Sequence, residues 1–125
     1  MPGILQYFET LNAGDFDGTA NLFADDGVLH APFEAPIMGS ISIASYLKTE
    51  ARGMQLEPLQ GVSQILEDGN VEVQVSGRVQ TSAFGINVAW LFLLNSDQKI
   101  LSVTVKLLAS PQELLNLRSQ TKFDV

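Results

Sequence analysis

The sequence predicts an α+β domain in which three N-terminal helices pack on a curved antiparallel sheet and a short helix ends the chain. Two features of the 125 residues predict this class. Apolar residues recur at helical spacing up to residue 53, and they alternate with polar residues in several runs between residues 56 and 108. Helices and strands segregated in this way pack as two layers, so we expect a cone-shaped space between them. The absence of a repeat or linker predicts one domain over residues 1–125.

Two short helices are predicted before residue 28. Apolar residues at helical spacing predict the first over residues 4–11, and the NAGD segment at 12–15 ends it. Asp17 is expected to cap the second helix, because its side chain can accept a hydrogen bond from a backbone N–H of the first turn. That helix is expected to include residues 22–23 and to end at the ADDG segment, residues 24–27.

A third helix is predicted after a short strand and a loop. The strand covers residues 28–31, and two prolines and a glycine predict the loop at 32–39. Ser40 is expected to cap the helix and Gly53 to end it. The apolar stripe of this helix consists of Ile43, Tyr46 and Leu47.

Four antiparallel strands are predicted in the second half of the chain. The first covers residues 56–66, and the valines of 71–80 alternate with polar side chains, which predicts one buried and one solvent-facing side. Residues 86–94 are almost all apolar, as expected of a central strand covered on both faces. The last strand covers residues 100–108, and the segments EDGN and NSDQ supply turns between strands.

A short amphipathic helix is predicted after the last strand. Ser110 is expected to cap it, Pro111 occupies its first position, and Glu113 completes a capping box.

Composition excludes several classes of function. The chain has no cysteine and one histidine, which excludes disulfides, thiolate catalysis and cysteine-based zinc sites and disfavours a metal cluster. A net charge of −7 with scattered basic residues argues against nucleic acid as a partner. The first ten residues lack a basic region and a long apolar run, so we expect a cytoplasmic protein. With 46% hydrophobic and 17% charged residues, against about 25% charged on average, the chain either has a large core or leaves apolar surface for a ligand or partner.

Tyr7 and Trp90 are the candidate binding residues. Each is a large apolar group with one hydrogen-bond donor, set among apolar neighbours, and a buried donor needs an acceptor. A ligand carbonyl would satisfy both donors. The alternative is that each donates to a backbone carbonyl or to water, as most buried tyrosines and tryptophans do.

Longer segments resemble a known family. The sequence YFETLNAGDFDGTANLFADDGVL, together with APFEAPIMG, SGRVQT, NVAWLFLLN and LLASPQELLN, is similar in order and spacing to the nuclear transport factor 2-like superfamily. Within it, these segments resemble the C-terminal domain of the cyanobacterial orange carotenoid protein and its stand-alone homologues. The resemblance covers nearly the whole chain.

This resemblance implies a ligand and a set of contacts. In that family a keto-carotenoid such as canthaxanthin or echinenone lies in the cone, and a tyrosine and a tryptophan that match Tyr7 and Trp90 hydrogen-bond its ring carbonyl. Each candidate lining residue could equally be ordinary core, because the same alternation would point it inward in either case. The candidates are Phe8, Leu11, Phe33, Phe84, Phe92, Val103 and Val105.

The sequence also departs from the family pattern. Where the full-length protein has a Pro-Trp pair before Phe-Gly, this chain has Ser82 and Ala83 before Phe84 and Gly85, and the following connection is shorter. The match is therefore to a stand-alone homologue. That implies a homodimer holding one carotenoid across two cavities, quenching of excitation or singlet oxygen, and transfer to or from helical carotenoid proteins or, through transient contact, membranes. A regulatory cysteine found in some members is missing.

A dimerisation module whose exposed sheet face pairs with a second copy is one alternative, and it is compatible with carotenoid binding. An enzyme is another, because the superfamily includes ketosteroid isomerases, dehydratases and epoxide hydrolases. Ketosteroid isomerase uses a tyrosine, a protonated aspartate and an aspartate base. By alignment Tyr7 matches the tyrosine, but the two aspartates fall at Trp90 and Ala31, so no catalytic residue is assigned. His30 and Glu34 could still act as acid or base, although His30 should point away if Ala31 faces the cavity. Five other carboxylates are interpreted as turn residues: Asp25, Asp26, Glu67, Asp68 and Asp97.

Overall fold

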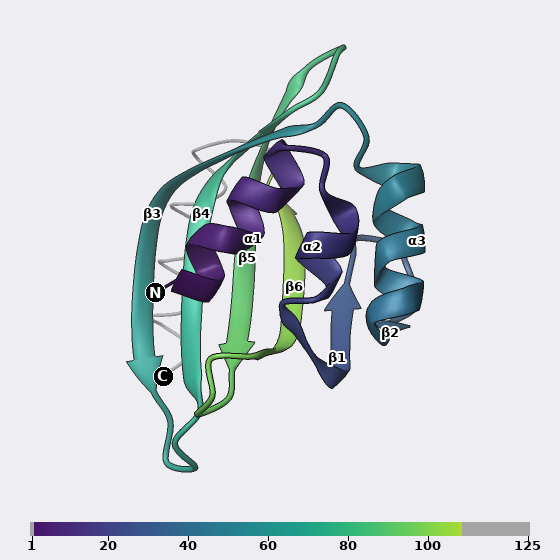
Figure 1. The fold of residues 1–125 in the computed structure, drawn as a ribbon. Coiled ribbons are helices and arrows are strands. Elements are labelled where there is room, and N and C mark those ends of the chain that lie inside the picture. The colour runs from purple at the N-terminus through teal and green to yellow at the C-terminus, as the bar shows by residue number, and fades with distance from the viewer. Residues whose placement is uncertain (1, 109–125) are drawn as a thin grey trace.

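The computed structural model describes residues 2–108, and Figure 1 shows that these residues place three helices on one face of a six-stranded sheet. The helices are α1 (Pro2–Asn12), α2 (Phe16–Ala20) and α3 (Ser40–Glu50). The strands are β1 (Phe23–His30), β2 (Ile37–Met38), β3 (Gln55–Ile65), β4 (Val71–Gln80), β5 (Gly85–Leu94) and β6 (Ile100–Leu108). The predicted α+β class is confirmed. The helix predicted from Ser110, Pro111 and Glu113 lies outside the described residues.

The sheet is mixed, which corrects the prediction of an antiparallel sheet. Its strand order is β2-β1-β6-β5-β4-β3. Strands β3 to β6 form the expected antiparallel meander, but β1 runs parallel to β6, with Leu29 opposite Val103 and His30 opposite Thr104. Alternation along one segment predicts a strand without identifying its neighbour. The chain passes through α3 and three strands of the meander before β6 returns to lie beside β1.

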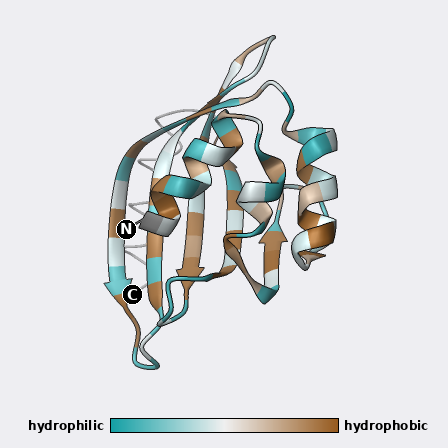
Figure 2. Cartoon of the chain, viewed as in Figure 1, coloured by the Kyte–Doolittle hydropathy of each residue, from teal (hydrophilic) through white to brown (hydrophobic). Residues whose placement is uncertain are grey.

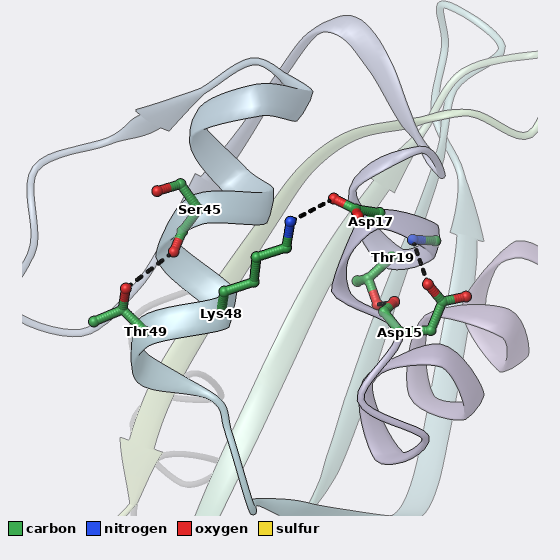
Figure 3. A network of polar contacts seen from close by, with 7 residues as sticks. Asp15, Asp17, Thr19, Ser45, Lys48 and Thr49 are labelled. Carbon is green, nitrogen blue, oxygen red and sulfur yellow. Dashed lines mark hydrogen bonds and ion pairs between the residues drawn. The ribbon is translucent and has the colours of Figure 1, made fainter.

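The second helix is shorter than predicted and has a different cap. Asp15 caps it, because a carboxylate oxygen of Asp15 accepts the backbone N–H of Gly18 at 3.0 Å (Figure 3). The helix then ends at Ala20. Asp17, the predicted cap, lies inside the helix and pairs with Lys48 of α3 at 3.0 Å. Both side chains of this pair are exposed, so it contributes little to stability.

The ADDG segment lies within β1 instead of ending a helix. Phe23 pairs with Ile100, and the register of the β1–β6 ladder then shifts before Val28. The shift leaves Asp25 and Asp26 in an irregular stretch where both side chains are exposed. A bulge of this kind accommodates polar residues in an otherwise apolar strand.

The loop predicted at residues 32–39 contains a two-residue strand. Ile37–Met38 pairs antiparallel with β1 and forms one edge of the sheet. The N-cap of α3 is Gly39, with φ +84°, so Ser40 is the first helical residue and its side chain makes no capping hydrogen bond. Gly53, with φ +81°, lies in the turn after the helix, a backbone conformation that glycine adopts without strain.

The core lies on the face of the sheet that meets the helices. In β4 the predicted alternation is confirmed, since Val73 and Val75 are buried whereas Gln74 and Arg78 are exposed. Figure 2 shows β5 as hydrophobic over nearly its whole length. The buried side chains of β5 on the helix-facing side are Val88, Trp90, Phe92 and Leu94.

Asn12 fastens the end of α1 to the start of β3. Its side-chain nitrogen donates to the carbonyl of Leu56 at 2.9 Å, and its side-chain oxygen accepts the N–H of Leu56 at 2.7 Å. Two hydrogen bonds from one side chain hold the helix at a fixed position over the sheet. This position sets one wall of the space beneath the helices.

Candidate functional site

A cavity of about 170 Å³ lies between the helices and the sheet, in the space that this packing was predicted to leave. Helix side chains from α1 and α3 form one wall, and side chains of five strands and their turns form the others. The lining is almost entirely apolar. It consists of Tyr7, Leu11, Leu29, Ala31, Pro32, Tyr46, Leu47, Glu50, Ala51, Met54, Leu56, Val79, Thr81, Ile86, Val88, Trp90, Val105 and Leu107.

Tyr7 and Trp90 both line this cavity. Tyr7 lies on α1 and is 2% exposed, whereas Trp90 lies on β5 and is 1% exposed. Trp90 is held between two neighbouring strands, opposite Val75 of β4 and Val105 of β6. The fold therefore brings the two donors singled out from the sequence to one cavity from opposite layers.

Both residues carry a hydrogen-bond donor and both contribute to the cavity wall. Among residues 2–108, no protein group accepts a hydrogen bond from the Tyr7 hydroxyl or the Trp90 indole N–H, yet no fully enclosed side-chain polar atom lacks a partner. Burial, together with the nearby Tyr46, raises the pKa of Tyr7, so its phenol keeps its proton. Within residues 2–108, these two groups are therefore candidate donors to an acceptor in the cavity.

Two phenylalanines support the donors from behind. The ring of Phe8 meets the indole of Trp90 edge to face, with ring centroids 4.8 Å apart, and Phe92 meets the ring of Tyr7 in the same way at 5.1 Å. Phe8 also contacts Tyr7 and Phe92, at 5.4 and 5.8 Å. Perpendicular aromatic contacts of this kind fix ring orientation. The four rings form a rigid wall that limits how far either donor can turn.

The predicted lining residues divide into three groups. Leu11 and Val105 line the cavity. Phe8, Phe92 and Val103 are buried in the core and do not line it. Phe33 and Phe84 are 97% and 57% exposed, so neither is a wall residue. Phe33 lies in the loop after β1 with φ +65°, and Phe84 lies in the turn between β4 and β5, where alternation no longer directs a side chain inward.

Three residues of α3 that line the cavity, Tyr46, Leu47 and Glu50, were not predicted as part of the site. Tyr46 lines the cavity, and Glu50 follows it by about one helical turn. Partial burial and the negative charges of Glu34 and Glu50 raise the pKa of Tyr46. The apolar stripe of the third predicted helix already contained Tyr46 and Leu47, and that stripe was the signal that could have identified these two residues.

The residues considered for catalysis do not gather in the cavity. Ala31 lines it, but its neighbour His30 does not, as expected for consecutive residues at the end of a strand. Glu34 is exposed and outside the lining. No three of the histidine, aspartate and glutamate side chains in residues 2–108 are placed to share a metal ion. Over the same residues, no helix combines the length and apolarity that crossing a membrane requires.

Comparison with known families identifies the family to which the domain belongs. Residues 4–108 match the model of the Nuclear transport factor 2 (NTF2) domain. The chain belongs to this family. A fold does not by itself determine a function, so function has to be argued from the cavity and from closer relatives.

Close relatives of this NTF2 domain are orange carotenoid-binding proteins. The chain is 47% identical over 118 residues to the one from Limnospira maxima and 44% identical over 117 residues to the one from a Synechocystis strain. These matches cover 91% and 90% of the chain but only 37% of each relative. A solved Orange Carotenoid Protein from Anabaena (Nostoc), described as binding canthaxanthin, superposes with a TM-score of 0.85 at 45% identity, over 91% of this chain and 38% of that one. Such coverage is consistent with a homologue of its C-terminal domain.

Proposed function

We propose that the chain binds a keto-carotenoid, such as canthaxanthin or echinenone, with one end ring in the cavity. The observation that carries this proposal is the pair of donor residues, Tyr7 and Trp90, on a mostly apolar lining. A ring ketone has one oxygen with two lone pairs, which two donors can share. The remaining ring is apolar, and its burial contributes roughly 25 cal/mol per Å². The relatives named for carotenoid binding support this ligand class.

The size of the cavity supports a shared ligand. At about 170 Å³ it is smaller than the roughly 300–1,000 Å³ of sites that enclose a whole ligand, so it would hold one end of a long molecule. The rest of the polyene would leave past the lining residues that reach solvent, among them Glu50 and Leu107. We propose that a second copy, mouth to mouth with the first, covers the other end, giving a homodimer around one carotenoid.

A carrier and quencher role follows from this arrangement. A pigment held half inside each copy is released when the two copies separate, which suits transfer to helical carotenoid proteins or to membranes. While bound, the polyene can accept excitation or quench singlet oxygen. An isomerase is less well supported, because Ala31 and Trp90 occupy the positions that the catalytic aspartates hold in ketosteroid isomerase.

The decisive test is an absorption spectrum. The chain is produced in a host that makes canthaxanthin, and we expect an orange to violet protein. Removing one donor with Tyr7→Phe or Trp90→Phe is expected to shift the visible band, because the carotenoid carbonyl then loses one hydrogen bond. Tyr7→Phe removes the hydroxyl alone, whereas Trp90→Phe replaces the indole by a smaller aromatic ring without a donor. Tyr46→Phe is the matched control, since it removes a hydroxyl from another cavity residue and should leave the band in place. A colourless wild-type protein, or bands unchanged in both donor variants, would refute the proposal.

The shared ligand is tested by stoichiometry. Absorbance of the pigment and quantitative amino-acid analysis are expected to give one carotenoid for two chains. One carotenoid for each chain would contradict the mouth-to-mouth arrangement while leaving carotenoid binding intact.

A further inference from the structure

The β3 strand leaves one edge of the sheet open in the described part of the chain. β3 is last in the strand order and pairs only with β4. The ladder is irregular between Pro58 and Gln60, but from Gln60 to Ile65 it continues opposite β4 without a shift. These six residues present a row of backbone N–H and C=O groups on their outer side, which can pair with another extended strand.

Exposed apolar side chains gather along this edge. Leu59, Val62 and Ile65 of β3 are all exposed, as is Leu5 of the neighbouring helix α1. Three of them, Leu5, Leu59 and Val62, line an open hollow of about 810 Å³ between α1 and β3, whose floor includes Phe8. Figure 1 shows β3 at the outer edge of the sheet with α1 beside it. An apolar patch next to an open strand edge is typical of an interface between proteins.

The distribution of charge identifies the partner. Each chain carries a net charge of −7, so two copies repel one another over most of their surfaces. Residues 58–66 contain no charged side chain, and the flanking charges are Glu57 and Glu67. This edge is therefore a place where two copies can approach with like charges only at the two ends of the paired segment. Every copy also offers the same open edge, which satisfies the self-complementarity that a two-fold interface requires.

We propose that β3 pairs antiparallel with β3 of a second copy, centred on Val62, so that two sheets join edge to edge. This interface is separate from the cavity mouth and does not depend on the ligand, so it forms in the pigment-free protein. An antiparallel pairing centred there brings the Glu57 end of one strand near the Glu67 end of the other. Association should accordingly strengthen as added salt screens these carboxylates.

The test measures the mass of pigment-free protein by sedimentation equilibrium. We expect a concentration-dependent dimer for the wild type, tighter at 0.5 M than at about 0.05 M salt, a range over which exposed charges become strongly screened. Val62→Lys should weaken dimerisation at least tenfold, because a charge on each strand then faces the centre of the pair. Ile41→Lys is the matched control, since it replaces an exposed apolar residue of α3, on another part of the molecule, and should dimerise like the wild type.

Cross-linking gives an independent readout, because the chain contains no cysteine. Under mild oxidation Val62→Cys is expected to form a disulfide-linked dimer, whereas Ile41→Cys should remain monomeric on a denaturing gel. Circular dichroism checks that each variant is folded, and Ile65→Lys replaces Val62→Lys should the latter fail to fold. A monomeric wild type at every concentration, or a dimer unaffected by both lysine variants, would overturn the proposal. A retained carotenoid band in Val62→Lys would show that the ligand site is intact whichever result is obtained.

Discussion

The ring of Phe8 stands edge to face against the indole of Trp90, with centroids 4.8 Å apart and ring planes inclined at 81°. Phe8 lies on α1, directly after Tyr7, and Trp90 lies on β5. One contact thus links the helix that carries the first donor to the indole that carries the second. The orientation of both donors depends on packing behind the cavity wall as well as on the residues that line it.

Replacing Phe8 by leucine should loosen this wall. We expect Phe8→Leu to lower the free energy of unfolding by about 1–2 kcal/mol, because the aromatic contacts are lost while most of the apolar volume is kept. Trp90 is the only tryptophan, so its fluorescence reports the cavity directly and should shift in this variant. Phe84→Leu, at an exposed position, is the control and should change neither quantity. Unaltered stability and emission in Phe8→Leu would contradict the supporting role.

Removing the Asn12 side chain should destabilise the junction of α1 and β3. Asn12→Ala leaves the N–H and C=O of Leu56 without their partners, and we expect a loss of about 2 kcal/mol in urea unfolding. Asn21→Ala, at an exposed helix end, should lie within about 0.5 kcal/mol of the wild type. Equal stability of the two variants would show that the Asn12 hydrogen bonds contribute nothing.

Alkaline pH should distinguish Tyr7 from phenylalanine. Burial raises the pKa of Tyr7 above its ordinary value of 10.0. Below pH 10 the phenol is protonated in both folded and unfolded chains, so the stability does not depend on pH through this group. Above pH 10 the unfolded phenol ionises first, and stability should fall by up to about 1.4 kcal/mol for each pH unit. Urea unfolding between pH 9 and pH 11 should show a shallower decline in Tyr7→Phe, and identical slopes would disprove the assignment.

Gly77 should tolerate no side chain. A Cβ atom at this position would collide with the backbone carbonyl of Glu57 and lie 3.0 Å from the Cα of Pro58, both on β3. We expect Gly77→Ala to cost about 3 kcal/mol, since backbone atoms on both strands would have to move. Gly61→Ala is a matched control on the same strand pair, because its Cβ would make only ordinary van der Waals contacts, with a methyl group of Val75 at 3.7 Å and the carbonyl oxygen of Gln74 at 3.8 Å. Its unfolding free energy should be close to that of the wild type, and similar losses in both variants would contradict the steric argument.

The elements with a strong local signal were predicted best. Residues 71–80 alternate cleanly, and β4 has exactly the expected bounds, because one face of a half-buried strand must be apolar. The pairing of β1 with β6 was missed because no local pattern encodes a neighbour so distant in sequence. Asp15 and Asp17 are equally good N-caps by residue type. The folded backbone decides between them, because it places the N–H of Gly18 within hydrogen-bond distance of the Asp15 carboxylate.

The candidate site was predicted in part for the same reason. Tyr7 and Trp90 stand out because their size and single donors are visible in the sequence, and the fold places both on the cavity. Phe33 and Phe84 are as hydrophobic as any core residue, but each lies in a connection whose path the sequence does not specify. Tyr46 was assigned to the core of α3 because helical spacing shows that a side chain points inward without showing whether it meets a cavity.

The parallel pairing of β1 with β6 has a consequence for how the domain is made. Its contacts join the first and last main strands, so the entropy of closing a long loop is lost before this ladder forms, which slows folding. During synthesis β1 cannot pair with β6 until residues 100–108 have left the ribosome. Until then the cavity lacks the part of its wall that Val105 and Leu107 of β6 form, so a nascent chain should complete this cavity only after residues 100–108 have emerged.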